Sequence, residues 1–266
     1  MGVTKKKAET RNVRVTRIKD RSRHEFVDKV VRERPVTIFL NDSEIATFMC
    51  SPTDLESLAV GFLYTEGVLS GRGDVLSVSA DGKDGVVWVR AKGKKMNIRD
   101  IVSRRLVTTG CGRGLSFQDP SANRSLRVRS NLRVDPRALK ALMGEFQKRS
   151  ELYKETGGVH GAALCDSSDL LVLREDIGRH NAIDKVIGHC VLEGFDMSDK
   201  ILVTSGRITS EMIIKCARSN IPIVVSKSAP TDLGVSLAKS FGVTLVGFVR
   251  GSRMNVYSNV SRLTSQ

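Results

Sequence analysis

The sequence of 266 residues predicts an α/β protein with a smaller α+β part at its N-terminal end. In the C-terminal half, short apolar segments alternate with segments of helical periodicity, which is typical of a sheet covered by helices on both faces. Before residue 92, pairs of short apolar segments flank turn sequences, which is typical of hairpins. Hydrophobic residues make up 40% and charged residues 27% of the chain. This ordinary globular composition excludes pervasive disorder and collagen-like architectures.

Two hairpins are expected in the N-terminal part. Residues 1–34 are basic and predict a mostly solvated tail or an edge strand. The segments Val36–Leu40 and Ile45–Met49 flank an Asn-Asp-Ser turn and predict the first hairpin. The segments Val75–Ser79 and Val86–Arg90 flank a glycine-containing turn and predict the second.

Helices and strands are expected to alternate after the first hairpin. Ser51 is predicted to cap a helix, with Pro52 in its first turn and Gly67 after its end. Another helix is expected to open at Asp135-Pro136. The elements expected next are strands at 161–165 and 170–173, a helix through 182–190, a strand at 201–204, a helix at 209–219, a strand at 221–225, a helix at 231–241 and a strand at 243–248.

Three loops follow strands of this predicted sheet. They are Ser205-Gly206-Arg207, Ser226-Lys227-Ser228 and Arg250-Gly251-Ser252-Arg253. Ligands of such sheets bind at the carboxyl ends of the strands. Each loop is a weak signal alone, but their hydroxyls and cations together predict one anion site.

The net charge of +14 is unevenly distributed. Residues 1–34 carry +7 and residues 90–149 carry +12, so the rest of the chain carries −5. Such clusters attract anions, and nucleic acid, a phosphorylated cofactor and an acidic protein all fit this charge. Aromatic residues are only 5% of the chain, which gives little support to recognition of bases by stacking.

Cys111 is the cysteine with the most unusual surroundings. It lies in the segment Gly110-Cys111-Gly112-Arg113-Gly114, where nearby positive charge favours the thiolate. The alternatives left open are a reactive thiol and an unremarkable cysteine in a glycine-rich turn. The other cysteines are expected to be buried and inert, and are Cys50, Cys165, Cys190 and Cys216.

The cysteine spacing predicts neither a disulfide framework nor a zinc site, because no two of the five lie closer than 25 residues. No apolar segment approaches the length of a membrane span, and the first residues lack the pattern of a secretory signal. These observations predict a soluble cytoplasmic protein that does not bind membranes.

The segment Glu175–Lys185 is rich in charged residues. His180 and Asp184 are four residues apart and are expected to share a helix face. Arg179 and His180 lie near the expected helix start, where they could meet an anion. Capping and surface pairing are the alternative, and a structural role is likewise the simpler interpretation of His160.

The chain resembles the FdhD family of formate dehydrogenase accessory sulfurtransferases from about Arg34 to Tyr257. Besides the Cys111 loop, the resemblance rests on Leu58–Gly67 (LAVGFLYTEG), Gly158–Ala162 (GVHGA), Glu175–Lys185 (EDIGRHNAIDK), Val203–Glu211 (VTSGRITSE), Ser226–Thr231 (SKSAPT) and Gly247–Tyr257 (GFVRGSRMNVY).

The resemblance implies a fold and a division of the chain. It implies a three-layer α/β/α domain similar to cytidine deaminases at 103–266, a small α+β domain at 35–102, and a basic tail at 1–34. It also implies a homodimer.

The resemblance further implies a function. A cysteine desulfurase would supply sulfur to Cys111 as a persulfide. The sulfur would then pass to the molybdenum bis-(molybdopterin guanine dinucleotide) cofactor before the cofactor enters formate dehydrogenase. The residues implied or expected to bind this cofactor are Phe248, Val249, Arg250, Gly251, Ser252, Arg253, Ser205, Gly206, Arg207 and Lys227.

The sequence departs from related patterns at two positions. Many family members have a second cysteine where this chain has Gly114, so transfer through one cysteine is expected. If His160-Gly161-Ala162 occupies the place of the deaminase H-x-E motif, the general acid/base glutamate is replaced by Ala162, and no P-C-x-x-C follows. No zinc is therefore expected. The competing interpretations are a cofactor-binding chaperone that moves no sulfur and, with less support, a nucleic-acid-binding protein.

Overall fold

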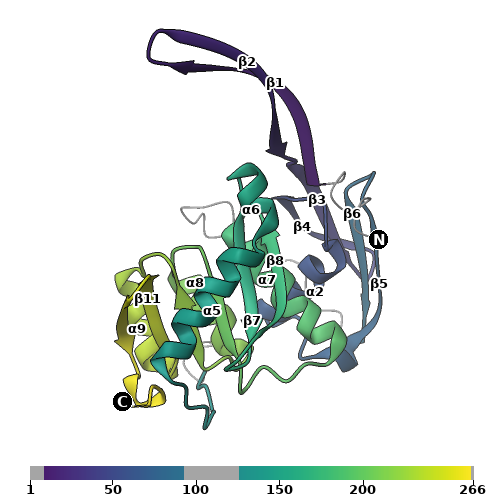
Figure 1. The fold of residues 1–266 in the computed structure, drawn as a ribbon. Helices are drawn as coiled ribbons and strands as arrows, with labels where there is room; N and C mark the ends of the chain where they lie inside the picture. The colour runs from purple at the N-terminus through teal and green to yellow at the C-terminus, as the bar shows by residue number, and fades with distance from the viewer. Residues whose placement is uncertain (1–8, 93–125, 265–266) are drawn as a thin grey trace.

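A six-stranded sheet in the order β12-β11-β10-β9-β7-β8 forms the centre of the α/β part (Figure 1). The computed structural model describes residues 9–92 and 126–264. β9, β10 and β11 are parallel to one another, whereas β7, β8 and β12 pair antiparallel with their neighbours. The strands are β7 (His160–Cys165), β8 (Leu170–Asp176), β9 (Ile201–Thr204), β10 (Ile223–Ser226), β11 (Thr244–Arg250) and β12 (Arg253–Ser258).

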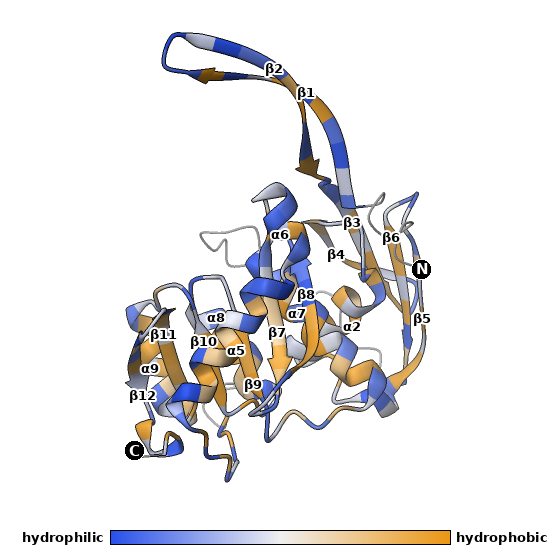
Figure 2. Cartoon of the chain, viewed as in Figure 1, coloured by the Kyte–Doolittle hydropathy of each residue, from blue (hydrophilic) through white to orange (hydrophobic). Residues whose placement is uncertain are grey.

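Helices cover both faces of this sheet because successive strand residues point to opposite sides. Ile201 and Val203 belong to the hydrophobic cluster that includes α5, whereas Leu202 belongs to the cluster that includes the helices of the other face. The predicted α/β class and its three layers are therefore confirmed, and apolar residues follow the central strands in Figure 2. The helices are α5 (Pro136–Arg149) on one face and α7 (Arg179–Glu193), α8 (Ser210–Arg218) and α9 (Asp232–Phe241) on the other. Short α6 (Glu151–Thr156) follows α5, and η3 (Val260–Arg262) follows β12.

A second, four-stranded sheet in the order β4-β3-β6-β5 forms the N-terminal α+β part. Both predicted hairpins are present, as β3–β4 and β5–β6, and β3 pairs in parallel with β6. The elements are β3 (Arg34–Leu40), β4 (Ser43–Cys50), α2 (Leu55–Thr65), η1 (Arg72–Asp74), β5 (Val75–Asp81) and β6 (Val86–Ala91).

The two parts meet where α2 crosses α7. A Cβ atom added to Gly61 would lie 1.8 Å from the Asp184 carbonyl oxygen, and one added to Gly188 would lie 1.8 Å from the Ser57 carbonyl oxygen. The backbones therefore approach as closely as only glycine allows. One hydrophobic cluster runs from Val36 of β3 to Leu245 of β11. The two parts thus share a core, while the predicted boundary between residues 102 and 103 lies outside the described residues.

The start of α2 differs from the prediction. Its N-cap is Asp54, and Ser51 caps nothing because it is fully buried and bonded elsewhere. The Ser51 amide donates to the Asp176 carboxylate at 3.0 Å, and its carbonyl accepts from the Lys185 ammonium at 3.0 Å. Ser51 therefore belongs to a buried polar cluster that joins the two parts.

Residues 10–31 form a projecting two-stranded arm rather than the predicted tail or edge strand (Figure 1). Its strands are β1 (Thr10–Lys19) and β2 (Ser22–Val31). Val15 lies opposite Phe26, and the Arg17 guanidinium lies 4.4 Å from the centre of the Phe26 ring. Lys29, near the root of the arm, forms an ion pair with Glu155 of α6. Cross-strand pairs of this kind stabilise a hairpin that composition alone marks as solvated.

No helix within the described ranges is both long and apolar enough to cross a membrane.

Candidate anion-binding site

A cavity of about 600 Å³ lies at the carboxyl ends of β9, β10 and β11. Parallel strands end at the same edge of a sheet, so the loops that follow them meet there. Ser205 after β9, Lys227 after β10 and Arg250 at the end of β11 all line the cavity. The predicted convergence of the three loops is therefore confirmed.

Hydrogen bonds hold the β9 loop against the start of β7. The Ser205 hydroxyl accepts from the Gly161 amide at 3.0 Å and lies 3.3 Å from Nδ1 of His160. The Thr204 hydroxyl donates to the Gly161 carbonyl at 2.9 Å. His160 also lines the cavity, so its imidazole has a fixed position at the wall.

Lys227 and Arg250 supply positive charge from adjacent loops. The Arg250 Nε donates to the Lys227 carbonyl at 3.1 Å, and its guanidinium carbon lies 5.7 Å from the centre of the Phe248 ring. Phe248 has a φ of 53°, and its amide donates to the Ser228 carbonyl at 3.1 Å. Within residues 9–92 and 126–264, neither Lys227 nor Arg250 forms an ion pair. The cavity therefore carries positive charge that no carboxylate of the described residues compensates.

His160 is held in its neutral form. Burial lowers its pKa, and the charges of Arg179, His180 and Arg207 lower it further. At neutral pH the imidazole can therefore accept or donate a hydrogen bond without adding charge.

The other predicted binding residues lie outside the lining of the cavity. The Val249 side chain is 1% exposed and packs in the core beneath α5. Gly251 and Ser252 form the turn between β11 and β12, and Arg253 is exposed at the start of β12. The remaining residues outside the lining are Gly206, Arg207 and Phe248.

Sequence reasoning missed the α6 wall of the cavity. Tyr153, Lys154 and Gly157 line it, although no helix was predicted there. The amides of Leu152 and Tyr153 each donate to the Glu175 carboxylate at 2.9 Å, which fixes the start of α6. The available signal was Gly157 directly after Glu151–Thr156, since glycine commonly ends a helix in the left-handed conformation. Gly157 has a φ of 65°.

Most charges of the Glu175–Lys185 segment have structural partners. Lys185 and Asp176 are fully buried, with Nζ 2.6 Å from Oδ2. The Asn181 amide donates to Asp176 at 2.9 Å. These contacts fix the β8–α7 connection and reach Ser51 in the other part of the molecule.

His180 and Asp184 share a helix face, as predicted, and that face lies against α8. His180 Nε2 is 2.9 Å from Glu211, and Asp184 is 2.8 Å from Lys215. Burial by itself lowers the pKa of Lys215, but the carboxylates of Asp184 and Glu66 outweigh burial and raise it. Both residues are therefore paired, as the alternative predicted, but the pairs are buried and not on the surface.

The four cysteines in the described residues are all buried. Burial raises the pKa of each thiol to about 12, so none of them supplies thiolate near neutral pH. The prediction that these cysteines are buried is confirmed. Cys111 lies outside the described residues, and its role stays a prediction.

No group of three His, Cys, Asp or Glu side chains suited to a metal ion occurs among the described residues. His160 begins β7, and Ala162, two residues on, is fully buried in that strand. If His160-Gly161-Ala162 corresponds to the deaminase motif, a core methyl group stands in place of the glutamate.

These features define a three-layer α/β protein with a cationic cavity at the carboxyl edge of its sheet. Residues 31–264 match the model of the FdhD/NarQ family. The chain is 39% identical over 259 residues to the sulfur carrier protein FdhD of Bacillus subtilis (strain 168), which covers 95% of this chain and 99% of that protein. It is also 39% identical over 243 residues to the sulfur carrier protein FdhD of Listeria innocua. The aligned residues cover 90% of this chain and 93% of that protein.

A crystal structure from Desulfotalea psychrophila gives a TM-score of 0.80 at 30% identity, covering 96% of this chain and all of that one. That protein is described as a candidate formate dehydrogenase accessory protein. The chain belongs to the FdhD/NarQ family.

Proposed function

We propose that this protein is a sulfurtransferase that carries sulfur from a cysteine desulfurase to the molybdenum bis-(molybdopterin guanine dinucleotide) cofactor of formate dehydrogenase. The relatives named as sulfur carriers support the general role. The observation that supports Cys111 as the sulfur-carrying residue is the burial of the other four thiols. A carrier needs a thiolate that another protein can reach, and those four do not provide one.

Cys111 accepts sulfur by displacement at a persulfide. Its thiolate attacks the terminal sulfur of the desulfurase persulfide, forming a new S–S bond while the old one breaks. The desulfurase cysteine leaves as a thiolate, so sulfur moves without net oxidation or reduction. The family resemblance implies a second cysteine at the position where this chain has Gly114, and the transfer is accordingly proposed to use one cysteine.

The cofactor is the substrate that receives this sulfur, and the cavity binds its nucleotide part. Lys227 and Arg250 supply positive charge for phosphate, and the Ser205 hydroxyl supplies a hydrogen bond. A volume of about 600 Å³ is within the usual range for a small-ligand cavity. The protein is proposed to work in the cytoplasm as a homodimer, in contact with the desulfurase and then with formate dehydrogenase.

Intact mass measurement after incubation with a cysteine desulfurase and cysteine tests the proposal. The wild-type chain gains one sulfur, which a reductant removes, whereas Cys111→Ala gains none and unfolds at the same urea concentration. Alkylation at neutral pH labels Cys111 alone in the native protein and all five cysteines in urea. Sulfur retained by the Cys111→Ala variant would contradict the assignment. Cofactor binding without any gain of sulfur would identify a chaperone instead of a carrier.

A further inference from the structure

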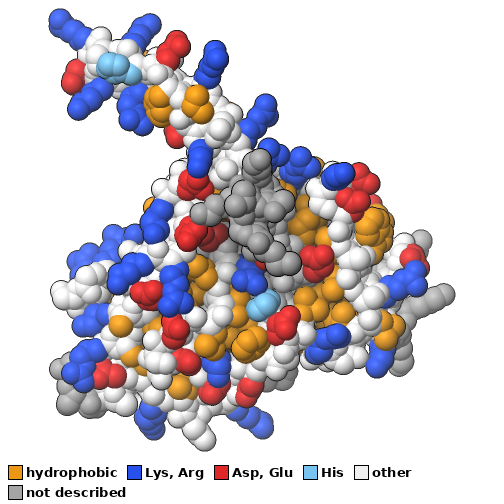
Figure 3. Space-filling view, turned by 45° about the vertical axis from the view of Figure 1, so that its right-hand side comes forward, with side chains coloured by type: hydrophobic (Ala, Val, Ile, Leu, Met, Phe, Trp, Pro, Cys, Tyr) orange, Lys and Arg blue, Asp and Glu red, His pale blue; other side chains and the backbone are white. Residues whose placement is uncertain are grey.

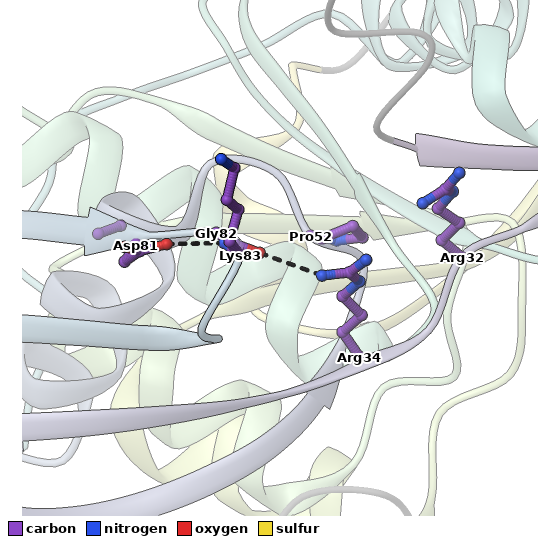
Figure 4. Close-up of a pocket in the computed structure, with 7 residues that line it drawn as sticks. Arg32, Arg34, Pro52, Asp81, Gly82 and Lys83 are labelled. Carbon is purple, nitrogen blue, oxygen red and sulfur yellow. Dashed lines mark hydrogen bonds between the residues drawn. The ribbon is translucent and has the colours of Figure 1, made fainter.

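A second cleft, of about 540 Å³, lies at the root of the arm (Figure 4). We call it the root cleft, and its lining residues are Arg32, Arg34, Pro52, Ala80, Asp81, Gly82 and Lys83. Arg32 directly follows β2, Arg34 begins β3, and Lys83 lies in the turn between β5 and β6. Three cations thus converge from the arm and from the four-stranded sheet.

Within the described residues, the two arginines of the root cleft are hydrogen-bonded to backbone carbonyls. Arg32 Nε donates to the Thr10 carbonyl at 2.9 Å, and Arg34 Nη1 donates to the Gly82 carbonyl at 3.3 Å. None of Arg32, Arg34 and Lys83 forms an ion pair with any residue in the described ranges. Their remaining donors and their charge are available to an anion.

Among the described lining residues, Asp81 is the acidic one, and its carboxylate is hydrogen-bonded within its own turn. Asp81 accepts hydrogen bonds from the Lys83 amide at 2.8 Å and from the Asp84 amide at 3.2 Å. These bonds lower the pKa of the Asp81 carboxyl group. The carboxylate shapes the wall of the root cleft and forms no ion pair with its cations.

The arm extends this positive surface away from the body of the protein. Residues 10–31 contain seven Lys or Arg and three Asp or Glu, and Figure 3 shows basic side chains along the whole arm. Ile18 is 67% exposed and Val27 is 61% exposed. A two-stranded hairpin is only marginally stable alone in water. A basic arm with exposed aliphatic side chains has the character of a contact surface for a macromolecule.

We propose that the root cleft and the arm bind an acidic segment of a partner protein, with Arg32 and Arg34 receiving its carboxylates. Guanidinium groups match the geometry of carboxylates, and the exposed aliphatic side chains suit a polypeptide. The arm offers few rings for stacking with nucleic-acid bases: Phe26 is its one Phe, Tyr or Trp residue, and Arg17 occupies one face of that ring. A second copy of the root cleft and the arm fits this surface poorly, because both are basic and like-charged surfaces repel.

The proposal concerns a different surface from the cavity and does not depend on the chemistry of Cys111. Its probe is a fluorescein-labelled peptide in which glutamate alternates with valine, titrated with the full chain and followed by fluorescence anisotropy. The test variant is Arg32→Ala/Arg34→Ala/Lys83→Ala. The matched control is Arg127→Ala/Arg129→Ala/Lys239→Ala. It also removes two arginines and one lysine, but from exposed positions outside the root cleft.

The root-cleft variant is expected to bind the peptide about tenfold more weakly or worse, whereas the control loses about twofold or less. Urea unfolding verifies that both variants fold. Equal losses in the two variants would overturn the proposal, because attraction would then follow net charge alone.

Two further outcomes would also overturn it. One is a single-stranded oligonucleotide that binds more tightly than the peptide and loses its affinity in the root-cleft variant. The other is a chain that does not bind the peptide but self-associates through these same cations, as measured by sedimentation. Intact mass measurement of the same variants after incubation with a desulfurase and cysteine tests the proposed sulfur transfer separately.

Discussion

Lys185 and Lys227 are the same kind of residue in opposite situations. Lys185 is fully buried and paired with Asp176, whereas Lys227 lines a cavity and has no ion pair among the described residues. The α7–α8 contact repeats the first situation with Asp184 and Lys215. Arg250 repeats the second at the edge of the same sheet.

The difference between these lysines separates charges that stabilise the fold from charges that are available to a ligand. A buried charge costs several kcal/mol to desolvate, so it persists only where a partner compensates it, and its role is to fix the geometry of its neighbours. A half-exposed charge without a partner costs little and contributes almost nothing to stability. It is available to a ligand. The dense charge pattern of Glu175–Lys185 belongs largely to the first class, and the sparse cations of the strand-end loops belong to the second.

The largest expected effect is the loss of stability when the buried Lys185–Asp176 pair is broken. Lys185→Met leaves the Asp176 carboxylate buried without its cation, which costs about 3–5 kcal/mol of unfolding free energy. Urea denaturation measures this loss. The same substitution at half-buried Lys227 is expected to change stability by about 0.5 kcal/mol or less. A loss of under about 1 kcal/mol for Lys185→Met would remove the distinction between the two regions.

The next largest effect is on ligand binding, where substitution of the cavity residues matters more than substitution of the buried pair. Lys227→Ala/Arg250→Ala is expected to weaken GDP binding about tenfold or more, because both cations line the cavity. Calorimetry measures this change, and GDP is expected to bind more tightly than ADP. Stability stays the same, and Cys111 still accepts sulfur from the desulfurase.

Two comparisons make that measurement specific. Arg127→Ala/Arg129→Ala removes two exposed cations elsewhere and is expected to leave GDP binding unchanged. Arg253→Ala is expected to weaken binding less than Arg250→Ala, since Arg253 lies at the start of β12, outside the lining of the cavity. Equal GDP affinities for wild type and the double variant would place the nucleotide elsewhere.

A smaller effect concerns pH. The pKa of His160 is lowered in the folded protein, so below about pH 6.5 the unfolded chain binds more protons than the folded one. The contribution of His160 therefore makes stability fall as pH decreases from about 6.5 through the lowered pKa. His160→Gln removes this contribution and flattens the dependence of unfolding free energy on pH. Urea midpoints between neutral and mildly acidic pH measure it, and parallel curves for the two proteins would contradict it.

Removal of metal ions is expected to have no effect on stability. The buried carboxylates Asp176 and Asp184 are neutralised by lysines, so a metal has no structural task there. Protein purified without a metal-affinity tag is expected to contain well under one zinc per chain, and EDTA is expected to leave the unfolding midpoint unchanged. Elemental analysis showing stoichiometric zinc would contradict this prediction and favour zinc chemistry of the deaminase type.

The features that follow from local periodicity could be predicted from the sequence. Alternating strands and helices gave the three layers, and the parallel order of β9, β10 and β11 brought the three loops together. The arm could not be predicted from charge, because its folding depends on pairs such as Val15 and Phe26 across a turn. Ser51 matches a helix cap in sequence, yet its partner Asp176 is remote in the chain and leaves no local signal.

The crossing of α2 and α7 at Gly61 and Gly188 also sets an order of events on the ribosome. The four-stranded sheet is complete in sequence by Ala91, long before α7 has been synthesised. Contacts between distant parts of a chain form late, and domains emerge from the ribosome N-terminal end first. The face of α2 that will meet α7 therefore waits exposed until Glu193 has left the exit tunnel. During that interval a nascent-chain chaperone has apolar surface to bind, and two neighbouring nascent chains have the same surface through which to associate wrongly.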